Sequence, residues 1–266
     1  MSWWGKIVGG TLGFMVGGPI GALFGVYAGH NFDNGLQQDF GSTAKFSRGS
    51  QERVQATFFT ATFSVMGCIA KADGHISKKE IDFANNIMNE MQLTAEMKKA
   101  ARELFNKGKQ SNFKLNDVLA QFKKETYGRR TLLQMFLEIQ IRAASADGSI
   151  HQGEKSILYT VSRNLGFSDY ELASLISRFN AEQRFDSRQS QSYSSGNQLK
   201  HAYGILGLKE SCTDQELKRA YRRLMSQHHP DKLIAKGLPE EMMVLATEKT
   251  QEIKSAYEMI RKQRKK

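Results

Sequence analysis

The sequence predicts an all-α protein in which a single N-terminal transmembrane helix precedes two helical domains. Three observations lead to this fold class. The 266 residues include only three prolines, Pro19, Pro230 and Pro239, so about 210 consecutive residues lack the residue that most strongly breaks helices. Apolar residues in the middle and at the end of the chain recur at intervals of three and four, the period of an amphipathic helix. Ten of the 23 glycines lie in the first 35 residues, which sets that segment apart.

Composition limits the possible function classes. Two cysteines, Cys68 and Cys212, are too few for a disulfide framework, a cysteine-rich zinc site or an iron–sulfur cluster, and a reducing compartment is the default. The net charge of +11 suits an anionic membrane or a nucleic acid, but charge bears on association and not on fold. We find no motif for a nucleophile with its base and oxyanion donors, and no phosphate-binding loop. We therefore expect no enzymatic activity, no catalytic residue and no cofactor.

The first segment, residues 1–34, is expected to cross a membrane. No Asp, Glu, Lys or Arg occurs from Ile7 to Gly29, and these 23 residues, at about 1.5 Å each, are long enough for a hydrocarbon core of about 30 Å. Trp3, Trp4 and Tyr27 lie near the ends of the run, where aromatic side chains favour the membrane interface. These features predict a transmembrane anchor.

A secretory signal peptide is the alternative for this segment, because Lys6 precedes the apolar run and residues 26–28 resemble a cleavage site. The run is long for a signal peptide, which favours the anchor. Lys45, Arg48 and Arg53 follow the span, against Lys6 before it. This balance predicts a cytoplasmic C-terminal body and a short periplasmic N-terminus.

Glycines recur at every fourth residue through the predicted span. Such a stripe lies on one helix face and allows a second helix to approach closely. We expect the anchor to self-associate, so that the protein is a homodimer held through this helix. The glycines of the stripe are Gly5, Gly9, Gly13, Gly17, Gly21, Gly25 and Gly29.

Residues 50–180 contain an internal repeat. The pattern Ala-Asp-Gly-x-Ile at residues 72–76 recurs 74 residues later at residues 146–150, and Glu80 and Glu154 keep the same offset. Apolar residues at helical spacing precede each pattern. Each repeat is therefore expected to form a helix, a tight turn and a second helix.

The spacing Asp-Gly-x-Ile-x-x-x-Glu matches the second half of an EF-hand loop, in which Gly turns the chain and Glu closes the calcium cage. The first half of the loop does not match. Positions one and three are Ile69 and Lys71 in the first repeat and Ala143 and Ser145 in the second, so oxygen ligands are missing. An ordinary EF-hand is excluded.

Two interpretations of the repeat stay open. In the structural one, Gly74 and Gly148 turn the chain, and Ser77 with Glu80 forms a capping box for the following helix. The other follows from a resemblance, because the repeated Ala-Asp-Gly-x-Ile with its following Glu resembles the TerB-like helical domain of tellurite-resistance proteins. Some members of that family are associated with metal. The resemblance thus implies candidate metal ligands, though no assigned site, at Asp73, Glu80, Asp147 and Glu154.

Residues 105–128 interleave lysines with aromatic and aliphatic residues. Such a pattern can bind nucleic acid. At helical spacing it instead predicts apolar core residues beside a solvated face. We therefore expect no nucleic-acid partner.

Residues 181–198 become rich in Gln and Ser. A tract of this composition buries little apolar surface, so it predicts a flexible linker. The linker would separate the central domain from a C-terminal module, residues 199–266.

The C-terminal module carries two apolar stripes of equal length that predict an antiparallel helical hairpin. The stripes are Leu217, Ala220, Tyr221 and Leu224, and Ile253, Ala256, Tyr257 and Ile260. Thr213 and Glu216 form an S/T-x-x-E capping box at the start of the first helix. Between the helices lies His228-His229-Pro230-Asp231-Lys232, in which the proline disfavours helix at His229 and favours a turn.

The helix, the His-Pro-Asp loop and the second helix, led by Tyr-x-x-Leu-Gly-Leu at residues 203–208, resemble the J domain of DnaJ-type co-chaperones. The resemblance implies that His229, Pro230 and Asp231 stimulate ATP hydrolysis by a DnaK-type chaperone. It also implies that the basic face of the preceding helix binds that chaperone, since clustered cations steer the encounter with an acidic partner. In this sequence the basic face consists of Lys218, Arg219, Arg222 and Arg223.

The order of anchor, TerB-like domain, linker and J domain resembles the bacterial membrane-anchored DnaJ-like co-chaperones. The resemblance implies a co-chaperone in the inner membrane that brings a DnaK-type chaperone to a client whose identity the sequence does not give. The alternative is a metal-responsive or scaffolding membrane protein that acts through the TerB-like domain. The basic end of the chain, residues 261–266, is expected to fray in solvent or to contact anionic lipid.

Overall fold

The computed structural model describes residues 45–72, 74, 78–189 and 195–264, and all regular structure within these ranges is helical, as predicted. The predicted transmembrane segment, with its seven glycines, lies outside the described residues. Within the described ranges no helix combines the length and the apolar character needed to cross a bilayer. The elements are α4 (Lys45–Ala70), α5 (Lys78–Glu90), α6 (Ala95–Gly108), α7 (Leu115–Glu125), α8 (Arg130–Ala144), α9 (Gln152–Leu165), α10 (Asp169–Gln189), α11 (Ser195–Ile205), α12 (Asp214–His228), α13 (Pro230–Ala235), the 3-10 turn η1 (Glu240–Met242) and α14 (Met243–Arg264).

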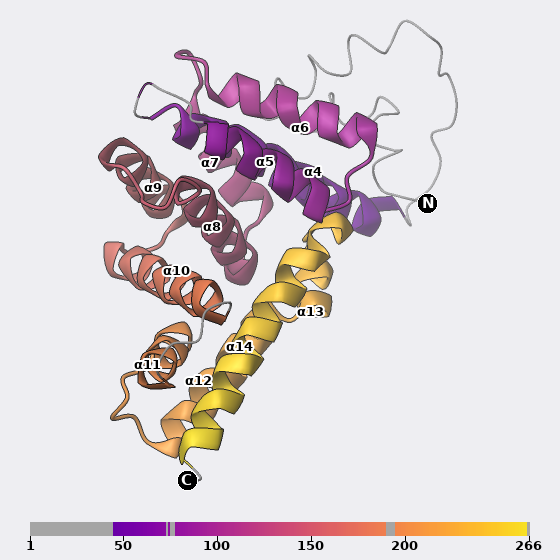
Figure 1. Cartoon of the computed structure of the whole chain (residues 1–266). Helices are drawn as coiled ribbons and strands as arrows, with labels where there is room; N and C mark the ends of the chain where they lie inside the picture. Colours follow the sequence, from indigo (N-terminus) through magenta and orange to yellow (C-terminus); the bar gives the residue numbers. More distant parts are fainter. Residues whose placement is uncertain (1–44, 73, 75–77, 190–194, 265–266) are drawn as a thin grey trace, which may run out of the picture.

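Helix α4 forms the centre of the first domain, which comprises α4 to α10 and is called the central domain below (Figure 1). Nearly every residue from Val54 to Ala70 is buried, so α4 is covered on all sides and not on one stripe only. Three of its buried hydroxyl groups are hydrogen-bonded within the helix: the Oγ atoms of Thr60, Thr62 and Ser64 each donate to the carbonyl oxygen four residues earlier, at 2.8 Å. Burial of polar groups is tolerated when they are hydrogen-bonded in this way.

Aromatic rings and two glycines fix how the neighbouring helices pack on α4. The rings of Phe58, Phe122 and Phe136 meet with centroids 4.7 to 6.0 Å apart, joining α4, α7 and α8. Helices α4 and α6 touch through their backbones, since a Cβ atom at Gly67 would lie 2.0 Å from the Phe105 oxygen and one at Gly108 would lie 1.8 Å from the Ser64 oxygen. Only glycine fits at these two positions.

The two repeats form the expected helix–turn–helix units. Gly74 lies between α4 and α5 with a φ of +88°, and Gly148 lies between α8 and α9 with a φ of +109°. These left-handed conformations favour glycine. The structural interpretation of the repeat therefore accounts for the glycine that occurs in both copies of the pattern.

The chain differs from the prediction at residues 181–198. Helix α10 continues through the expected start of the linker to Gln189, and α11 begins at Ser195, so helix occupies both ends of the predicted flexible tract. Helices α10 and α11 pack on each other, and a Cβ atom at Gly204 would lie 2.7 Å from the Ala181 Cβ. Tertiary contact thus stabilises helix where composition alone favoured a linker.

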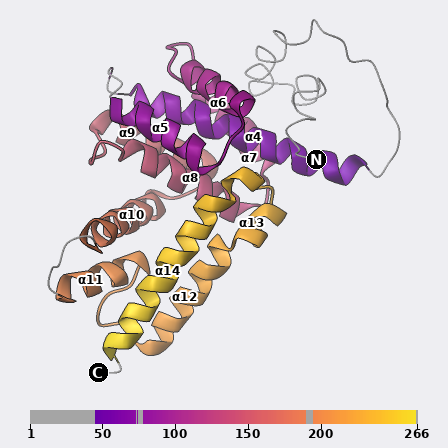
Figure 2. The ribbon, with the colours of Figure 1, turned by 45° about the vertical axis from the view of Figure 1, so that its right-hand side comes forward.

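Helix α14 connects the two parts of the molecule. It runs beside α12 and reaches α13 next to α4, as both views show (Figure 2). Its first turns belong to the core of the central domain through Leu245 and Ala246. Its second half belongs to a separate core with α11 and α12 through Ile253, Ala256 and Ile260. The position of α14 therefore sets how the His-Pro-Asp loop sits against the central domain.

Candidate functional site

Helix α12 begins with the predicted capping box. The backbone N–H of Thr213 donates to Glu216 Oε2 at 2.7 Å, and the N–H of Glu216 donates to Thr213 Oγ1 at 3.2 Å. The N–H bond from Thr213 is the largest of the interactions that lower the pKa of the Glu216 carboxyl. This cap fixes the register of the helix that carries the basic face.

The inner sides of α12 and α14 pack as the two stripes predict. Leu217, Ala220 and Leu224 are buried, and the rings of Tyr221 and Tyr257 stack with centroids 4.1 Å apart and an interplanar angle of 12°. The stacked pair lies on the flank of the hairpin, where both rings are half-buried. Packing on this side leaves the opposite side of α12 to solvent.

The basic face lies on that solvent-exposed side. All four of its side chains are exposed to solvent; they are Lys218, Arg219, Arg222 and Arg223. Exposed positive charges can steer the approach of an acidic surface, and salt screens this attraction. The face can therefore bind an acidic partner without rearrangement of the hairpin.

The His-Pro-Asp loop follows directly. His229 has an extended backbone, with φ −60° and ψ 123°, because the following proline disfavours the helical region, and Pro230 then occupies the first position of α13. The His229 side chain is 46% exposed and that of Asp231 is 87% exposed, with Nδ1 and Oδ2 3.9 Å apart. Lys232 Nζ donates to Ser226 Oγ at 2.7 Å and ties the loop back to α12. The loop thus presents an imidazole and a carboxylate to solvent.

Arg264 holds the end of α14 against the start of α12. Its guanidinium donates to the Tyr203 hydroxyl at 2.9 Å and to the Cys212 carbonyl oxygen at 2.7 Å, and it also pairs with Asp214. The expectation that the basic tail frays is wrong as far as Arg264, because these contacts fix the last described turn. Lys265 and Lys266 lie outside the described residues.

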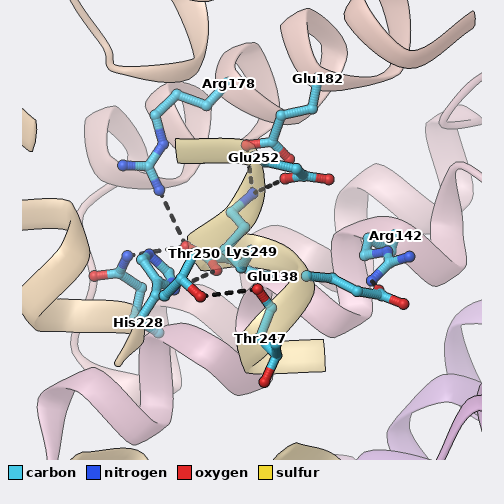
Figure 3. Close-up of polar contacts among 11 residues, drawn as sticks. Glu138, Arg142, Arg178, Glu182, His228, Thr247, Lys249, Thr250 and Glu252 are labelled. Atoms are coloured by element: carbon cyan, nitrogen blue, oxygen red, sulfur yellow. Dashed lines mark hydrogen bonds and ion pairs between the residues drawn. The ribbon is translucent and has the colours of Figure 1, made fainter. Parts of the chain in front are cut away.

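A buried ionic cluster includes His228, the residue before the loop, and none of the sequence patterns above predicted it (Figure 3). Arg178 Nη2 is 3.0 Å from Glu138 Oε1, and His228 Nδ1 is 3.6 Å from Glu138 Oε2. Lys249 pairs with Glu182 and lies 3.7 Å from Glu252. The cluster therefore joins α8 and α10 of the central domain to α12 and α14. One sequence signal for it exists, since Glu138 is the one acidic residue of α8 and lies between the apolar residues Leu137 and Ile139.

The members of this ionic cluster shift one another's pKa values. Burial alone raises the pKa of the Glu138 carboxyl, but His228, Lys249 and Arg178 outweigh burial, and the pKa is lowered. Burial lowers the pKa of His228, and Lys249 and Arg178 add to this effect against the opposing pull of Glu138. Burial disfavours the charged form of Lys249, but Glu182, Glu138 and Glu252 together raise its pKa. Near neutral pH the cluster thus holds an ionised Glu138 beside an uncharged His228.

The space beside the ionic cluster is small. A cavity of about 30 Å³ is lined by residues of α8, α10 and α14, among them Arg142, Arg178 and Lys249. This volume suits one or two water molecules.

The candidate metal ligands do not converge within the described residues. Asp147 Oδ2 contacts His151 Nε2 at 2.7 Å, while Glu154 is buried and accepts the His151 N–H at 2.8 Å as part of a capping box. Asp73 and the Glu80 side chain lie outside the described part of the chain. Across the residues that are described, no group of three His, Cys, Asp or Glu side chains is arranged to hold a metal ion.

Comparison with known proteins gives three family matches. Residues 1–39 match the model described as the co-chaperone DjlA transmembrane domain, residues 59–176 match the tellurite resistance protein TerB, and residues 201–266 match the DnaJ domain. No solved structure matches the chain significantly.

Curated relatives match along almost the whole chain, and all of the following bear the name co-chaperone protein DjlA. The relative from Photobacterium profundum is 45% identical, over 98% of this chain and 99% of its own length. That from Coxiella burnetii is 46% identical over 99% of both chains, and that from Vibrio cholerae is 46% identical over 98% of both.

Proposed function

The chain belongs to the DjlA family of co-chaperones, and we propose that it stimulates ATP hydrolysis by a DnaK-type chaperone at the bacterial inner membrane. Its C-terminal module is a J domain and its function is that of a J-domain co-chaperone. The full-length matches to DjlA do not favour the alternative of a metal-responsive or scaffolding protein.

The exposure of the His-Pro-Asp loop carries the proposal. His229 and Asp231 point to solvent at one end of α12, next to the exposed basic face on the same helix. The four cations of that face would bind an acidic surface of the chaperone and set the register of the encounter. His229, Pro230 and Asp231 would then contact the ATPase and increase its rate of hydrolysis. The chain itself would form and break no covalent bond.

A membrane anchor would confine this activity to one surface. Residues 1–39 match the DjlA transmembrane domain, and this match supports a membrane-anchored protein. We propose a single span with a short periplasmic N-terminus and a cytoplasmic body, because the basic residues Lys45, Arg48 and Arg53 follow the span and ATP is in the cytosol.

We also propose a homodimer through the glycine stripe of the span. The support is that seven glycines recur at every fourth residue of the span, which allows close contact between helices in lipid. Replacing Gly17 and Gly21 by Leu should abolish crosslinking between spans in vesicles. Leu at Gly10 and Gly18, which lie off the stripe, is the matched control and should leave crosslinking intact. Equal crosslinking in both variants would refute the stripe as the dimer contact.

The experiment that tests the main function measures ATP turnover by DnaK with the full chain in lipid nanodiscs. The wild type should raise turnover and His229→Gln should abolish the increase. His151→Gln is the matched control, because His151 is an exposed histidine of the central domain. An unchanged increase with His229→Gln, or no increase with the wild type, would contradict the proposal.

A further inference from the structure

The residues that follow the His-Pro-Asp loop are anchored in the central domain. We call residues 229–246 the loop segment. Five of its apolar side chains are buried by at least 98% and join the core of α4 to α10, not the core of the J domain; they are Leu233, Leu238, Met242, Leu245 and Ala246. The central domain supplies part of the apolar surface that covers them. The loop segment therefore depends on a second domain for its burial.

Polar and backbone contacts hold the same segment to α4 and α8. Gln51 Nε2 donates to the Ile234 carbonyl oxygen at 3.3 Å, and Lys236 Nζ contacts Thr131 Oγ1 at 2.6 Å. Gly237 lies so close to α4 that a Cβ atom there would meet Val54 Cγ1 at 2.6 Å. The contact is thus fixed at more than one point along the segment.

The buried ionic cluster fixes the other side of the loop. His228, the residue immediately before the loop, is 2% exposed and faces Glu138 of α8. Lys249 lies in α14, about one turn after the end of the loop segment, and it pairs with Glu182 of α10. The central domain therefore holds the chain on both sides of His229, Pro230 and Asp231.

These contacts lie on the side of the loop that faces the central domain, and they leave the opposite side exposed to solvent. His229 is 46% exposed and Asp231 is 87% exposed, and the basic face of α12 is exposed as well. A contact that masked the J domain would bury these groups. The arrangement instead restricts the conformations of the loop while keeping it accessible, which is how a site is positioned in advance of binding.

We propose that the central domain positions the His-Pro-Asp loop for the chaperone, with Glu138 and Val54 as positioning residues. The inference rests on the proposed function, because positioning matters only if this loop stimulates an ATPase. Loss of the contact should lower the maximal stimulation of turnover, which depends on the loop. It should leave the concentration for half-maximal stimulation unchanged, since the basic face still mediates binding.

The test uses the full chain in lipid nanodiscs with two variants that disrupt the contact at different points. Glu138→Lys places a cation beside Lys249 and Arg178, and Val54→Trp inserts a large ring where Gly237 approaches α4. Glu103→Lys is the matched charge reversal, on α6, which lies across α4 from α13 and α14 in both views. Hydrogen exchange of the amides at 236–238, which bond within the loop segment, reports whether the contact has opened.

Both variants should increase exchange at these amides and lower the maximal stimulation about tenfold, with the half-maximal concentration within about twofold of the wild type. Exchange within α6 and α9 reports on the fold of the central domain and should match the wild type. Glu103→Lys should match the wild type in every measurement. A purely structural role would not separate the maximum from the half-maximal concentration.

Three outcomes would overturn the proposal. Faster exchange with an unchanged maximum would mean that the loop needs no positioning, and faster exchange with a higher maximum would mean that the contact masks the loop. Unchanged exchange in both variants would mean that the J domain holds the loop alone. Failure of the proposed function is recognised separately, because then the wild type gives no stimulation or His229→Gln retains it.

Discussion

His228 Nδ1 lies 3.6 Å from Glu138 Oε2, so the residue before the His-Pro-Asp loop faces a carboxylate of the central domain in the protein interior. Both side chains are almost completely enclosed, with 2% and 12% of their surface exposed. Among the residues that the structure describes, neither ring nitrogen of His228 has a hydrogen-bond partner. The pair therefore couples the position of the loop to the charge state of a buried group.

We expect stability to fall as the pH drops from about 7.5 to about 5.5. The pKa of His228 is below its ordinary value of 6.5 in the folded protein, because burial, Lys249 and Arg178 outweigh Glu138. Between that lowered pKa and 6.5 the unfolded chain binds more protons than the folded chain, so protonation favours unfolding. Glu138 stays ionised in this range, because its pKa is lowered. The contribution of one group is at most about 1.4 kcal/mol per pH unit.

Urea denaturation at several pH values measures this effect. His228→Gln should flatten the fall in the free energy of unfolding between about pH 6.5 and pH 5.5. An unchanged slope in His228→Gln would show that other groups cause the dependence.

Reversing charge on the basic face should weaken binding of the chaperone without unfolding the J domain. With Arg222→Glu we expect the DnaK concentration for half-maximal stimulation to rise about three- to tenfold, because steering is lost, and to depend less on salt. Lys254→Glu is a matched control on the exposed side of α14. Titration at low and at high salt measures both quantities. Equal effects of the two substitutions would point to net charge and not to the basic face.

Adding one methyl group between α4 and α6 should destabilise the central domain. In Gly108→Ala the new Cβ would meet the Ser64 carbonyl oxygen at 1.8 Å, so the two backbones must separate. We expect a loss of about 1 to 3 kcal/mol in the free energy of unfolding, measured in urea. Lys107→Ala on the same helix should change it by less than about 0.5 kcal/mol. A stability of Gly108→Ala equal to that of the wild type would disprove the close approach.

Removing the Arg264 side chain should loosen the end of the J domain. The guanidinium loses its bonds to the Tyr203 hydroxyl and the Cys212 carbonyl oxygen, which predicts a loss of about 1 to 2 kcal/mol. Hydrogen exchange in the last turn of α14 should become faster in Arg264→Ala. Lys262→Ala, at an exposed position, should leave exchange as it is. Equal exchange in the two variants would argue for a frayed tail.

Local patterns predicted the helices of the J domain and its loop. The spacing of Leu217 and Leu224, the cap at Thr213 and the conformation before Pro230 each depend on residues within one or two turns. The same reasoning was wrong for residues 181–189, which are helical, and for Arg264, which is held in place. In both cases a contact with a distant segment outweighs what composition favours.

The sequence by itself determined the all-α class, the repeated turns at Gly74 and Gly148, and the position of the His-Pro-Asp loop between two helices. These features follow from hydrophobic period, from glycine conformation and from the restriction that proline imposes, all of which are local. Only the tertiary structure decided that Glu138 meets His228, 90 positions further along the chain, and that the loop segment completes the core of the central domain. Such contacts depend on how whole helices pack, and no spacing within a single helix encodes them.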